Sequence, residues 1–300
     1  MAEQPKARIQ VVGPYDKARN GLQHCRLDRD LRLDHNRIQA SFPDLLTDID
    51  LDLLTLAGAV SYTDRTVRRR RGVCWARNLE VHVPVSDTAF WQQPLLCNAL
   101  IRCLALATGD EWRIIFTQLR KRRQLQPSLR AELRPFADLS CAIPFSGGLD
   151  STVGLKLWQA ANPESSALRI GTETNRDVGE VIRRTSAGWQ PTRRVSVLLS
   201  MRVGSHPEPT HRTRTFLFFT TAALAAKLAG VGRVVVMENG QGALGPSLVP
   251  LGDEWPYRAT HPLFTSSLRD LLRAVWGGSA PSFEHPHLWH PRCQDSCRMT

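Results

Sequence analysis

The residues best suited to chemistry in this chain lie at 146–151, which read Ser-Gly-Gly-Leu-Asp-Ser. The paired glycines allow the backbone to bend sharply and to approach a ligand closely. An apolar run at 141–145 precedes them and apolar residues at helical spacing follow them, which predicts a strand, a glycine-rich loop and a helix. Unpaired N–H groups and the dipole at the start of a helix favour an anion, and a phosphate suits such a site.

Three further polar features lie at or near the ends of predicted elements. Two arginines, Arg212 and Arg214, stand at the start of an apolar helix predicted at 213–229. A cation there opposes the helix dipole, and a bound anion would compensate. Residues 238–240, Glu-Asn-Gly, follow a strongly apolar run and predict a polar site edge. Residues 257–263 form a compact polar set in a proline-containing loop. The structural alternatives are a surface arginine pair, an ordinary strand-end turn and a structural histidine.

The elements that must position these residues divide the chain into two parts. We predict a smaller α+β domain over residues 1–136, ending in a basic, proline-containing linker. From residue 137 to 300, strands and helices alternate, which predicts an α/β domain with a parallel sheet and helices on both faces. In such sheets ligands bind at the carboxyl ends of the strands. The predicted strands are 9–12, 78–84, 112–116, 141–145, 168–172, 194–201 and 234–238. The predicted helices are 44–60, 95–107, the one that follows residue 151, 177–187 and 213–229.

The loop lacks the Gly-Lys-Ser/Thr ending of a Walker loop and matches Ser-Gly-Gly-x-Asp-Ser, the signature of the PP-loop ATP pyrophosphatases. The chain resembles this superfamily. Further stretches make it similar to the 7-cyano-7-deazaguanine synthase (QueC) family, and most closely to the QueC-like QatC proteins of the Qat anti-phage defence system. These stretches are 59–65, 75–77, 108–112, 214–218, 238–240 and 258–262. A chance glycine turn is the alternative interpretation of the loop.

The resemblance implies an adenine nucleotide alpha hydrolase-like fold, ATP and Mg²⁺ as cofactors, and a 7-deazaguanine carboxylate as substrate. QueC-type enzymes adenylate that carboxylate, displace AMP with ammonia and convert the amide to a nitrile. For the defence relatives it implies related chemistry, with attachment of the deazaguanine to a protein as an alternative. The catalytic candidates are Ser146, Asp150, Ser151 and Arg214. The ATP-binding candidates are Ser146, Gly147, Gly148, Leu149, Asp150, Ser151 and Arg214. The substrate-binding candidates are Glu238, Asn239, Gly240, Arg258, Thr260 and His261.

The composition, with 42% apolar and 22% charged residues, is that of a soluble globular protein. No apolar stretch is long enough to span a membrane and the first residues show no signal region, so we expect a cytoplasmic protein without membrane contact. The net charge of +11 fits a polyanionic ligand such as ATP or RNA, or a solvated basic surface. The arginines at 68–71 are expected to form a solvated loop, with a polyanion contact as the alternative.

The end of the chain departs from the QueC pattern, which includes a four-cysteine zinc site. Here Cys293 and Cys297 are present, and His285, His287 and His290 are the other ligand types nearby. A closed zinc site needs four ligands. We therefore expect little or no zinc and assign no metal ligands. A truncated or frame-shifted terminus is another interpretation of this tail, and it would place the activity in doubt.

Two other functions stay open. A PP-loop enzyme that modifies tRNA, by thiolation or lysine ligation, would suit the net charge and the arginines at 68–71, although no paired cysteines stand near the loop. A truncated chain could instead be a non-catalytic subunit of a defence complex. The expected partners are thus ATP, a small 7-deazaguanine substrate and proteins of a defence operon, with nucleic acid less favoured.

Overall fold

The computed structural model describes residues 6–42, 46–70, 74–121, 138–173, 180–181, 184, 192–201, 207–245 and 254–289. The strands are β1 (Ala7–Val12), β2 (Gln23–Arg26), β3 (Leu31–Leu33), β4 (Asn78–Val85), β5 (Glu111–Gln118), β6 (Leu139–Pro144), β7 (Ser166–Glu173), β8 (Thr192–Met201), β9 (Arg233–Val235) and β10 (Ser282–Glu284). The helices are α1 (His35–Gln39), α2 (Asp48–Thr66), α3 (Thr88–Trp91), α4 (Pro94–Thr108), α5 (Leu149–Ala161), α7 (Arg214–Leu228), α8 (Gly240–Leu244), α9 (Pro262–Trp276) and the 3₁₀ helix η2 (Gly277–Ser279).

The strands form two sheets. In the first, the strand order is β2-β1-β4-β5, and each pair runs parallel. The second has the order β10-β9-β6-β7-β8-β3, and its pairs are parallel except that β3 runs antiparallel to β8. The chain therefore has an α/β fold with two largely parallel sheets, each packed against helices.

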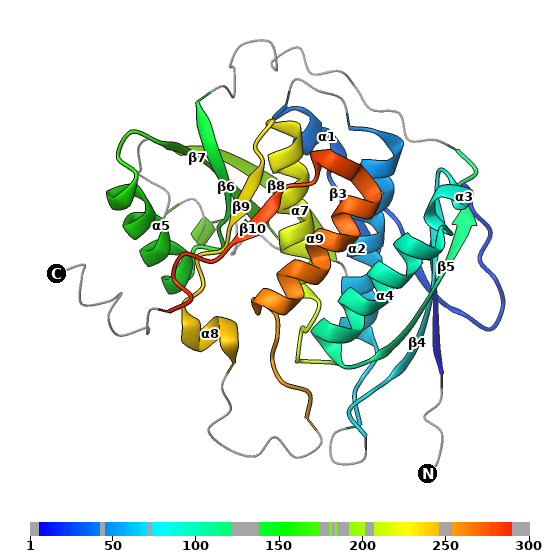
Figure 1. Cartoon of the computed structure of the whole chain (residues 1–300). Coiled ribbons are helices and arrows are strands. Elements are labelled where there is room, and N and C mark those ends of the chain that lie inside the picture. The colour runs from blue at the N-terminus through cyan, green and yellow to red at the C-terminus, as the bar shows by residue number, and fades with distance from the viewer. Residues whose placement is uncertain are drawn as a thin grey trace.

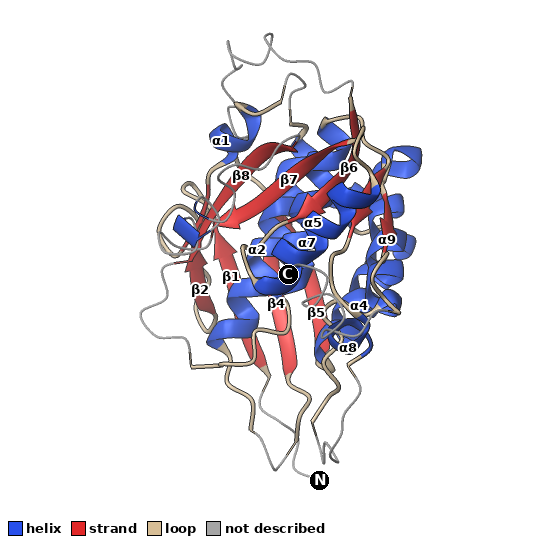
Figure 2. Cartoon of the chain, turned by 90° about the vertical axis from the view of Figure 1, so that its left-hand side faces the viewer, coloured by secondary structure: helices blue, strands red, loops and turns tan. Residues whose placement is uncertain are grey.

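Helices α2 and α7 lie between the two sheets and contact each other (Figures 1 and 2). α2 packs on β4 of the first sheet, and α7 packs on β6 and β7 of the second. Thr47 and Asp50 form a capping box that starts α2, and Lys227 of α7 pairs with Asp50 at 2.8 Å. One continuous apolar core therefore runs from the first sheet through these helices to the second.

The second sheet is covered on its other face by α5 (Figure 1). Successive side chains of a strand point to opposite faces, and β6 divides accordingly. Ala142 belongs to the core shared with α7, whereas Cys141 and Ile143 pack in a separate cluster with Leu155 and Trp158 of α5. The loop that joins β6 to α5 therefore starts at a strand that is packed on both faces.

Several predicted elements are confirmed. The strands predicted at 78–84 and 112–116 are β4 and β5, and the helix predicted at 95–107 is α4. α4 begins with a proline in its first turn and ends at Gly109, whose φ is 69°. These patterns were reliable because period-two strands and capped apolar helices follow local rules.

Two predicted elements end at other residues in the structure, and one helix was not predicted. The helix predicted to end at residue 60 continues to Thr66, because buried polar residues extend its packed face. The strand predicted to reach residue 238 ends at Val235, where its short neighbour β10 also ends. α9 was not predicted, because the proline at its first position was interpreted as part of a loop.

The first sheet is parallel, whereas an α+β arrangement was predicted for residues 1–136. Crossovers through α2 and through α4 return the chain to the same end of this sheet, which makes β1, β4 and β5 parallel. The linker predicted up to residue 136 and most of the helix predicted at 177–187 lie outside the described residues. The division into two domains at 136/137 stays a prediction.

Candidate functional site

The loop between β6 and α5 is held closed by its own polar groups. Gly147 has a φ of 75°, a conformation that glycine adopts without strain. The Gly148 amide donates to Ser146 Oγ at 3.3 Å, and Ser151 Oγ donates to the Gly148 carbonyl at 2.9 Å. The Ser146 and Ser151 hydroxyl oxygens lie 3.3 Å apart. The loop thus places two hydroxyl groups beside the first turn of α5.

Gly148 is the N-cap of α5 and has an ordinary extended backbone, with φ −73° and ψ 169°. A Cβ built at this position would have one neighbour within 4 Å, Ser146 Oγ at 3.3 Å. Neither the backbone conformation nor the packing of the described residues therefore requires glycine at 148. The first amides of α5 have no partners inside the helix, so a position without a side chain leaves them accessible to an anion.

A cavity of about 300 Å³ opens beside this loop. Predicted site residues from separate parts of the chain line it, namely Ser146, Gly148, Asp150, Ser151, Arg214, Glu238 and Thr260. The loop follows β6 and Glu238 lies shortly after β9, and these two strands pair in parallel. Their carboxyl ends therefore meet at one edge of the second sheet, where ligands of α/β folds bind.

Two predicted substrate-binding residues hold local structure next to this cavity. Asn239 Nδ2 donates to Asp150 Oδ1 at 2.9 Å, and Asn239 Oδ1 accepts from the Gly242 amide at 2.9 Å and caps α8. His261 Nδ1 accepts from the Leu263 amide at 3.0 Å and caps α9. Asn239 thus orients a carboxylate of the cavity, while His261 does not line it.

The described lining of the cavity does not include the other predicted residues, Gly147, Leu149, Gly240 and Arg258. Leu149 is 57% exposed, and a side chain on Gly240 would overlap the Leu288 carbonyl oxygen. Arg258 has a buried Nε without a hydrogen-bond partner among the described residues. Burial, and then the neighbouring Arg258 cation, lower the pKa of His261, which keeps its ring neutral and able to accept.

The protein itself supplies an anion at the start of α7. Asp64 is fully buried and accepts from the Thr213 amide at 2.9 Å and from the Thr213 hydroxyl at 3.1 Å. Thr213 is the N-cap of α7, so the carboxylate lies at the positive end of the helix dipole. Arg214 follows, lines the cavity and stacks on the Phe218 ring at 5.0 Å. The Asp64 carboxylate therefore compensates the arginine cations at the positive end of α7, and no ligand is needed for that. Arg214 faces the cavity.

Asp64 also anchors a buried network of charges. Arg69 and Arg77 each donate to Asp64 Oδ1, at 3.2 and 2.5 Å, and both also donate to Asp110. The side chains of all four residues are at most 3% exposed. Burial lowers the pKa of Arg77, but the hydrogen bonds and charges of Asp110 and Asp64 together outweigh burial and raise it, so Arg77 stays charged. The solvated loop expected at 68–71 is therefore wrong for Arg69.

Aromatic side chains contribute a part of the cavity that the sequence did not predict. Phe145, Phe218 and Tyr257 line it. Arg212 is 8% exposed and lies between the rings of Trp75, at 4.9 Å, and Tyr257, at 5.2 Å. This stacking holds the Tyr257 ring at the cavity, where a planar ligand ring could pack against it. The available signal was a tyrosine at the start of the polar stretch 257–263.

No protein-family model matches this chain, and no curated protein or solved structure matches it either. Among the helices that the structure describes, none is long and apolar enough to cross a membrane. Within the described ranges, no group of three or more His, Cys, Asp or Glu side chains is placed to hold a metal ion. Cys293, Cys297 and His290 lie outside those ranges.

Proposed function

We propose that this chain is a PP-loop enzyme that binds ATP and adenylates a 7-deazaguanine-type carboxylate. The observation that carries the proposal is the convergence of the loop at 146–151 with Arg214 and Glu238 on one cavity, at the carboxyl ends of parallel strands. The loop supplies amides at a helix start, and Arg214 supplies a cation. Both kinds of group bind phosphate oxygens.

The proposed reaction makes a poor acyl donor reactive. A carboxylate oxygen of the substrate attacks the α-phosphate of ATP, the bond to the β-phosphate breaks, and pyrophosphate leaves. The protein must stabilise the charge that moves onto the pyrophosphate and hold the reacting groups in line. The hydroxyls of Ser146 and Ser151 and the guanidinium of Arg214 are the groups that would do so.

Among the described residues, the carboxylates that line the cavity are Asp150 and Glu238, and oxygen ligands of this kind suit Mg²⁺. Magnesium usually needs only one or two protein carboxylates, together with phosphates and water, so the donor set fits. When bound, the ion would neutralise charge on the ATP phosphates. Asn239, which donates to Asp150 Oδ1, would keep that carboxylate in place.

The second half of the proposed reaction releases AMP. Ammonia attacks the acyl adenylate to give an amide, which a second activation converts to a nitrile, and attachment to a protein of a defence system is the variant of this step. A tRNA-modifying PP-loop enzyme and a non-catalytic defence subunit stay as the alternatives. Neither cavity lining nor loop geometry among the described residues favours them over adenylation of a deazaguanine carboxylate.

Replacing Gly148 by Val tests the loop directly. The valine side chain would occupy the space through which a phosphate reaches the α5 amides, so ATP binding should be lost. The fold should persist, because the backbone conformation at Gly148 suits any residue. Calorimetry with ATP, and pyrophosphate release with 7-carboxy-7-deazaguanine, are the measurements.

Gly232→Val is the matched control, since a Cβ at Gly232 would have no described neighbour within 4 Å and Gly232 does not line the cavity. It should bind ATP as the unchanged protein does. If Gly148→Val binds ATP equally well, the phosphate-loop assignment is wrong and the proposed function goes with it.

A further inference from the structure

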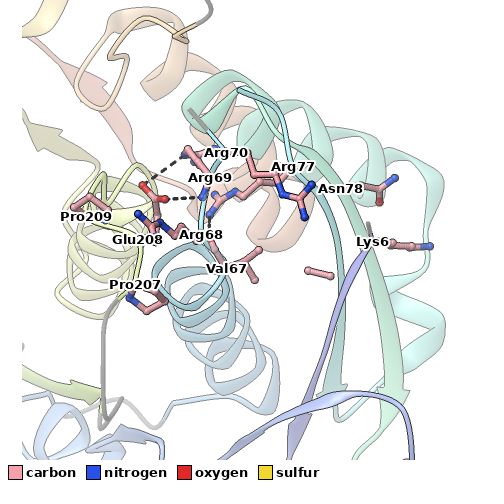
Figure 3. Close-up of a pocket in the computed structure, with 11 residues that line it drawn as sticks. Lys6, Val67, Arg68, Arg69, Arg70, Arg77, Asn78, Pro207, Glu208 and Pro209 are labelled. Atoms are coloured by element: carbon pink, nitrogen blue, oxygen red, sulfur yellow. Dashed lines mark hydrogen bonds and ion pairs between the residues drawn. The ribbon is translucent and has the colours of Figure 1, made fainter. Parts of the chain in front are cut away.

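A second cavity, of about 860 Å³, lies where α2 ends beside the first sheet (Figure 3). In the part of the chain that the structure describes, it shares no lining residue with the cavity at the glycine-rich loop. Its walls come from the segment after α2, from the starts of β1 and β4, and from the segment before α7. The cationic residues of its lining are Lys6, Arg68, Arg69, Arg70 and Arg77.

The backbone after α2 is extended, and this sorts the arginines by side. Val67 ends the helix with φ −99° and ψ 111°, and Arg70 forms an antiparallel bridge with Cys74. Side chains of an extended segment point alternately to opposite sides. Arg69 accordingly enters the buried network, whereas Arg68 and Arg70 are exposed and line the cavity.

The cations of the cavity wall differ in how far they are already neutralised. Arg69 and Arg77 donate to buried carboxylates, and Lys6 pairs with a carboxylate of β4 at 2.6 Å. Within the described ranges, the side chains of Arg68 and Arg70 have no hydrogen-bond or ion-pair partner. The alternation therefore places two guanidinium groups on the same side of one extended segment, and no described residue neutralises their charge.

The carboxylate among the lining residues, Glu208, does not oppose an anion in this cavity. It is 1% exposed and accepts from the Arg69 amide at 2.8 Å (Figure 3). It also accepts from the Thr210 hydroxyl at 2.5 Å. Burial raises the pKa of Glu208, but the hydrogen bonds from Thr210 and Arg69 outweigh burial and lower it. Its charge is therefore engaged in holding the arginine segment in place.

We propose that this second cavity binds a phosphate-bearing ligand through Arg68 and Arg70. Guanidinium groups match phosphate oxygens with paired hydrogen bonds, and an exposed pair that no described carboxylate engages can make them. The cavity also has aliphatic walls, from Val67, Pro207 and Pro209, and its volume lies in the range of small-molecule sites. A free nucleotide and the backbone of a nucleic acid present the same phosphate chemistry. The inference does not depend on the function proposed for the glycine-rich loop.

The test uses the full chain carrying Gly148→Val, so that binding at the loop is suppressed. Pyrophosphate, ADP, a short single-stranded RNA and a poly-glutamate peptide are titrated onto it by calorimetry or fluorescence anisotropy. The same titrations are repeated with Arg68→Glu and Arg70→Glu added. The control adds Arg19→Glu and Arg102→Glu, which change the net charge equally at exposed arginines outside the cavity. Melting temperatures show whether both sets of variants fold alike.

At least one phosphate probe should bind, and the Arg68/Arg70 substitutions should weaken it by about tenfold or more, because charged hydrogen bonds are lost. The control substitutions should change it by less than about twofold. Tighter binding of ADP identifies a nucleotide site. Tighter binding of RNA, with a salt dependence that falls by about one unit per lost contact, identifies a nucleic-acid backbone.

Three results would overturn the inference. These are no binding of any phosphate probe, an equal loss in the two sets of variants, or binding of poly-glutamate as tight as that of the phosphates. A failure of the loop assignment would leave this comparison intact, because every protein in it carries Gly148→Val.

Discussion

The arginines near Asp64 fall into two groups, one buried and paired with carboxylates and the other facing a cavity. Arg69 and Arg77 are buried and bound by two carboxylates, whereas Arg214 lines a cavity and has no ion-pair partner among the described residues. The difference lies in what surrounds each guanidinium, since the side chain is the same. A net charge of +11 therefore gives the number of cations, while the placement of the carboxylates decides which cations are left for ligands.

The buried charges of Arg69, Arg77 and Asp64 are stable only if all of them are fully paired. Removing charges from water is expensive, and a buried pair persists only when hydrogen bonds satisfy both partners. Asp64 meets this condition, with Arg69 and Arg77 on one oxygen and the Thr213 amide and hydroxyl on the other. The same carboxylate therefore joins the arginine network to the start of α7, one residue before Arg214.

The largest effect is expected when the buried charge network loses the Asp64 carboxylate. Asp64→Ala should destabilise the fold by about 3–5 kcal/mol, because it takes a buried carboxylate away from both Arg69 and Arg77 and removes a partner of the Thr213 amide. Urea unfolding followed by circular dichroism measures this change. Asp270→Ala is the control, because Asp270 is exposed and pairs only loosely with Arg269, at 3.5 Å. A similar loss in both variants would remove the distinction between the two regions.

The two regions also differ in how far the sequence predicts them. The glycine-rich loop was predicted because its residues are contiguous and the strand and helix beside it follow local periodicity. The burial of Arg69 was not, because its partners Asp110 and Glu208 are 41 and 139 residues away. A run of arginines has no local signal that marks one member as buried.

Tertiary packing explains the remaining differences. α9 was missed because His261 and Pro262 were interpreted as loop residues, although they are its cap and its first residue. Tyr257 was not assigned to the site, because its place at the cavity depends on stacking with Arg212. The joining of β3 to the second sheet also depends on contacts between distant segments.

The second-largest effect is expected at Asp150, which lines the same cavity as Arg214. Asp150→Ala should lower the rate of pyrophosphate release on the order of a hundredfold, while ATP still binds, because one electrostatic contact of the cavity is lost. Its effect on stability should be far smaller than that of Asp64→Ala, since Asp150 is only partly buried. Single-turnover assays and calorimetry with ATP separate the rate from binding.

Asp150→Asn is the companion variant, because an asparagine oxygen can still accept from Asn239. If the charge of Asp150 matters, Asp150→Asn should be as slow as Asp150→Ala. If orientation alone matters, Asp150→Asn should recover most of the rate. An unchanged rate in Asp150→Ala would show that this carboxylate has no part in the reaction.

The smallest expected effect concerns Glu80, another carboxylate that is fully paired. Its side chain is 3% exposed and lies 2.6 Å from Lys6 Nζ, 3.0 Å from Arg8 Nε and 2.9 Å from His82 Nε2. Burial raises the pKa of Glu80, but these hydrogen bonds outweigh burial and lower it to about 2. Lys6 and Arg8 remain partly solvated, at 35% and 51% exposure, so solvent screens their contribution.

A carboxylate whose pKa is lower in the folded state stabilises the fold above its ordinary pKa and loses that contribution as the pH falls through both values. The stabilisation by Glu80 should therefore be complete near neutral pH and decline between about pH 4.5 and about pH 2. Glu80→Gln should lower the melting temperature near neutral pH and flatten its fall over this acid range.

Glu284→Gln is the control, because Glu284 forms an exposed pair with Arg233, and it should leave the acid profile unchanged. ATP binding should be the same in all three proteins, because Glu80 lies in the first sheet and does not line the cavity beside the loop. An acid profile that Glu80→Gln does not alter would show that the pairing around Glu80 adds nothing to stability, and that complete pairing matters only where all partners are buried.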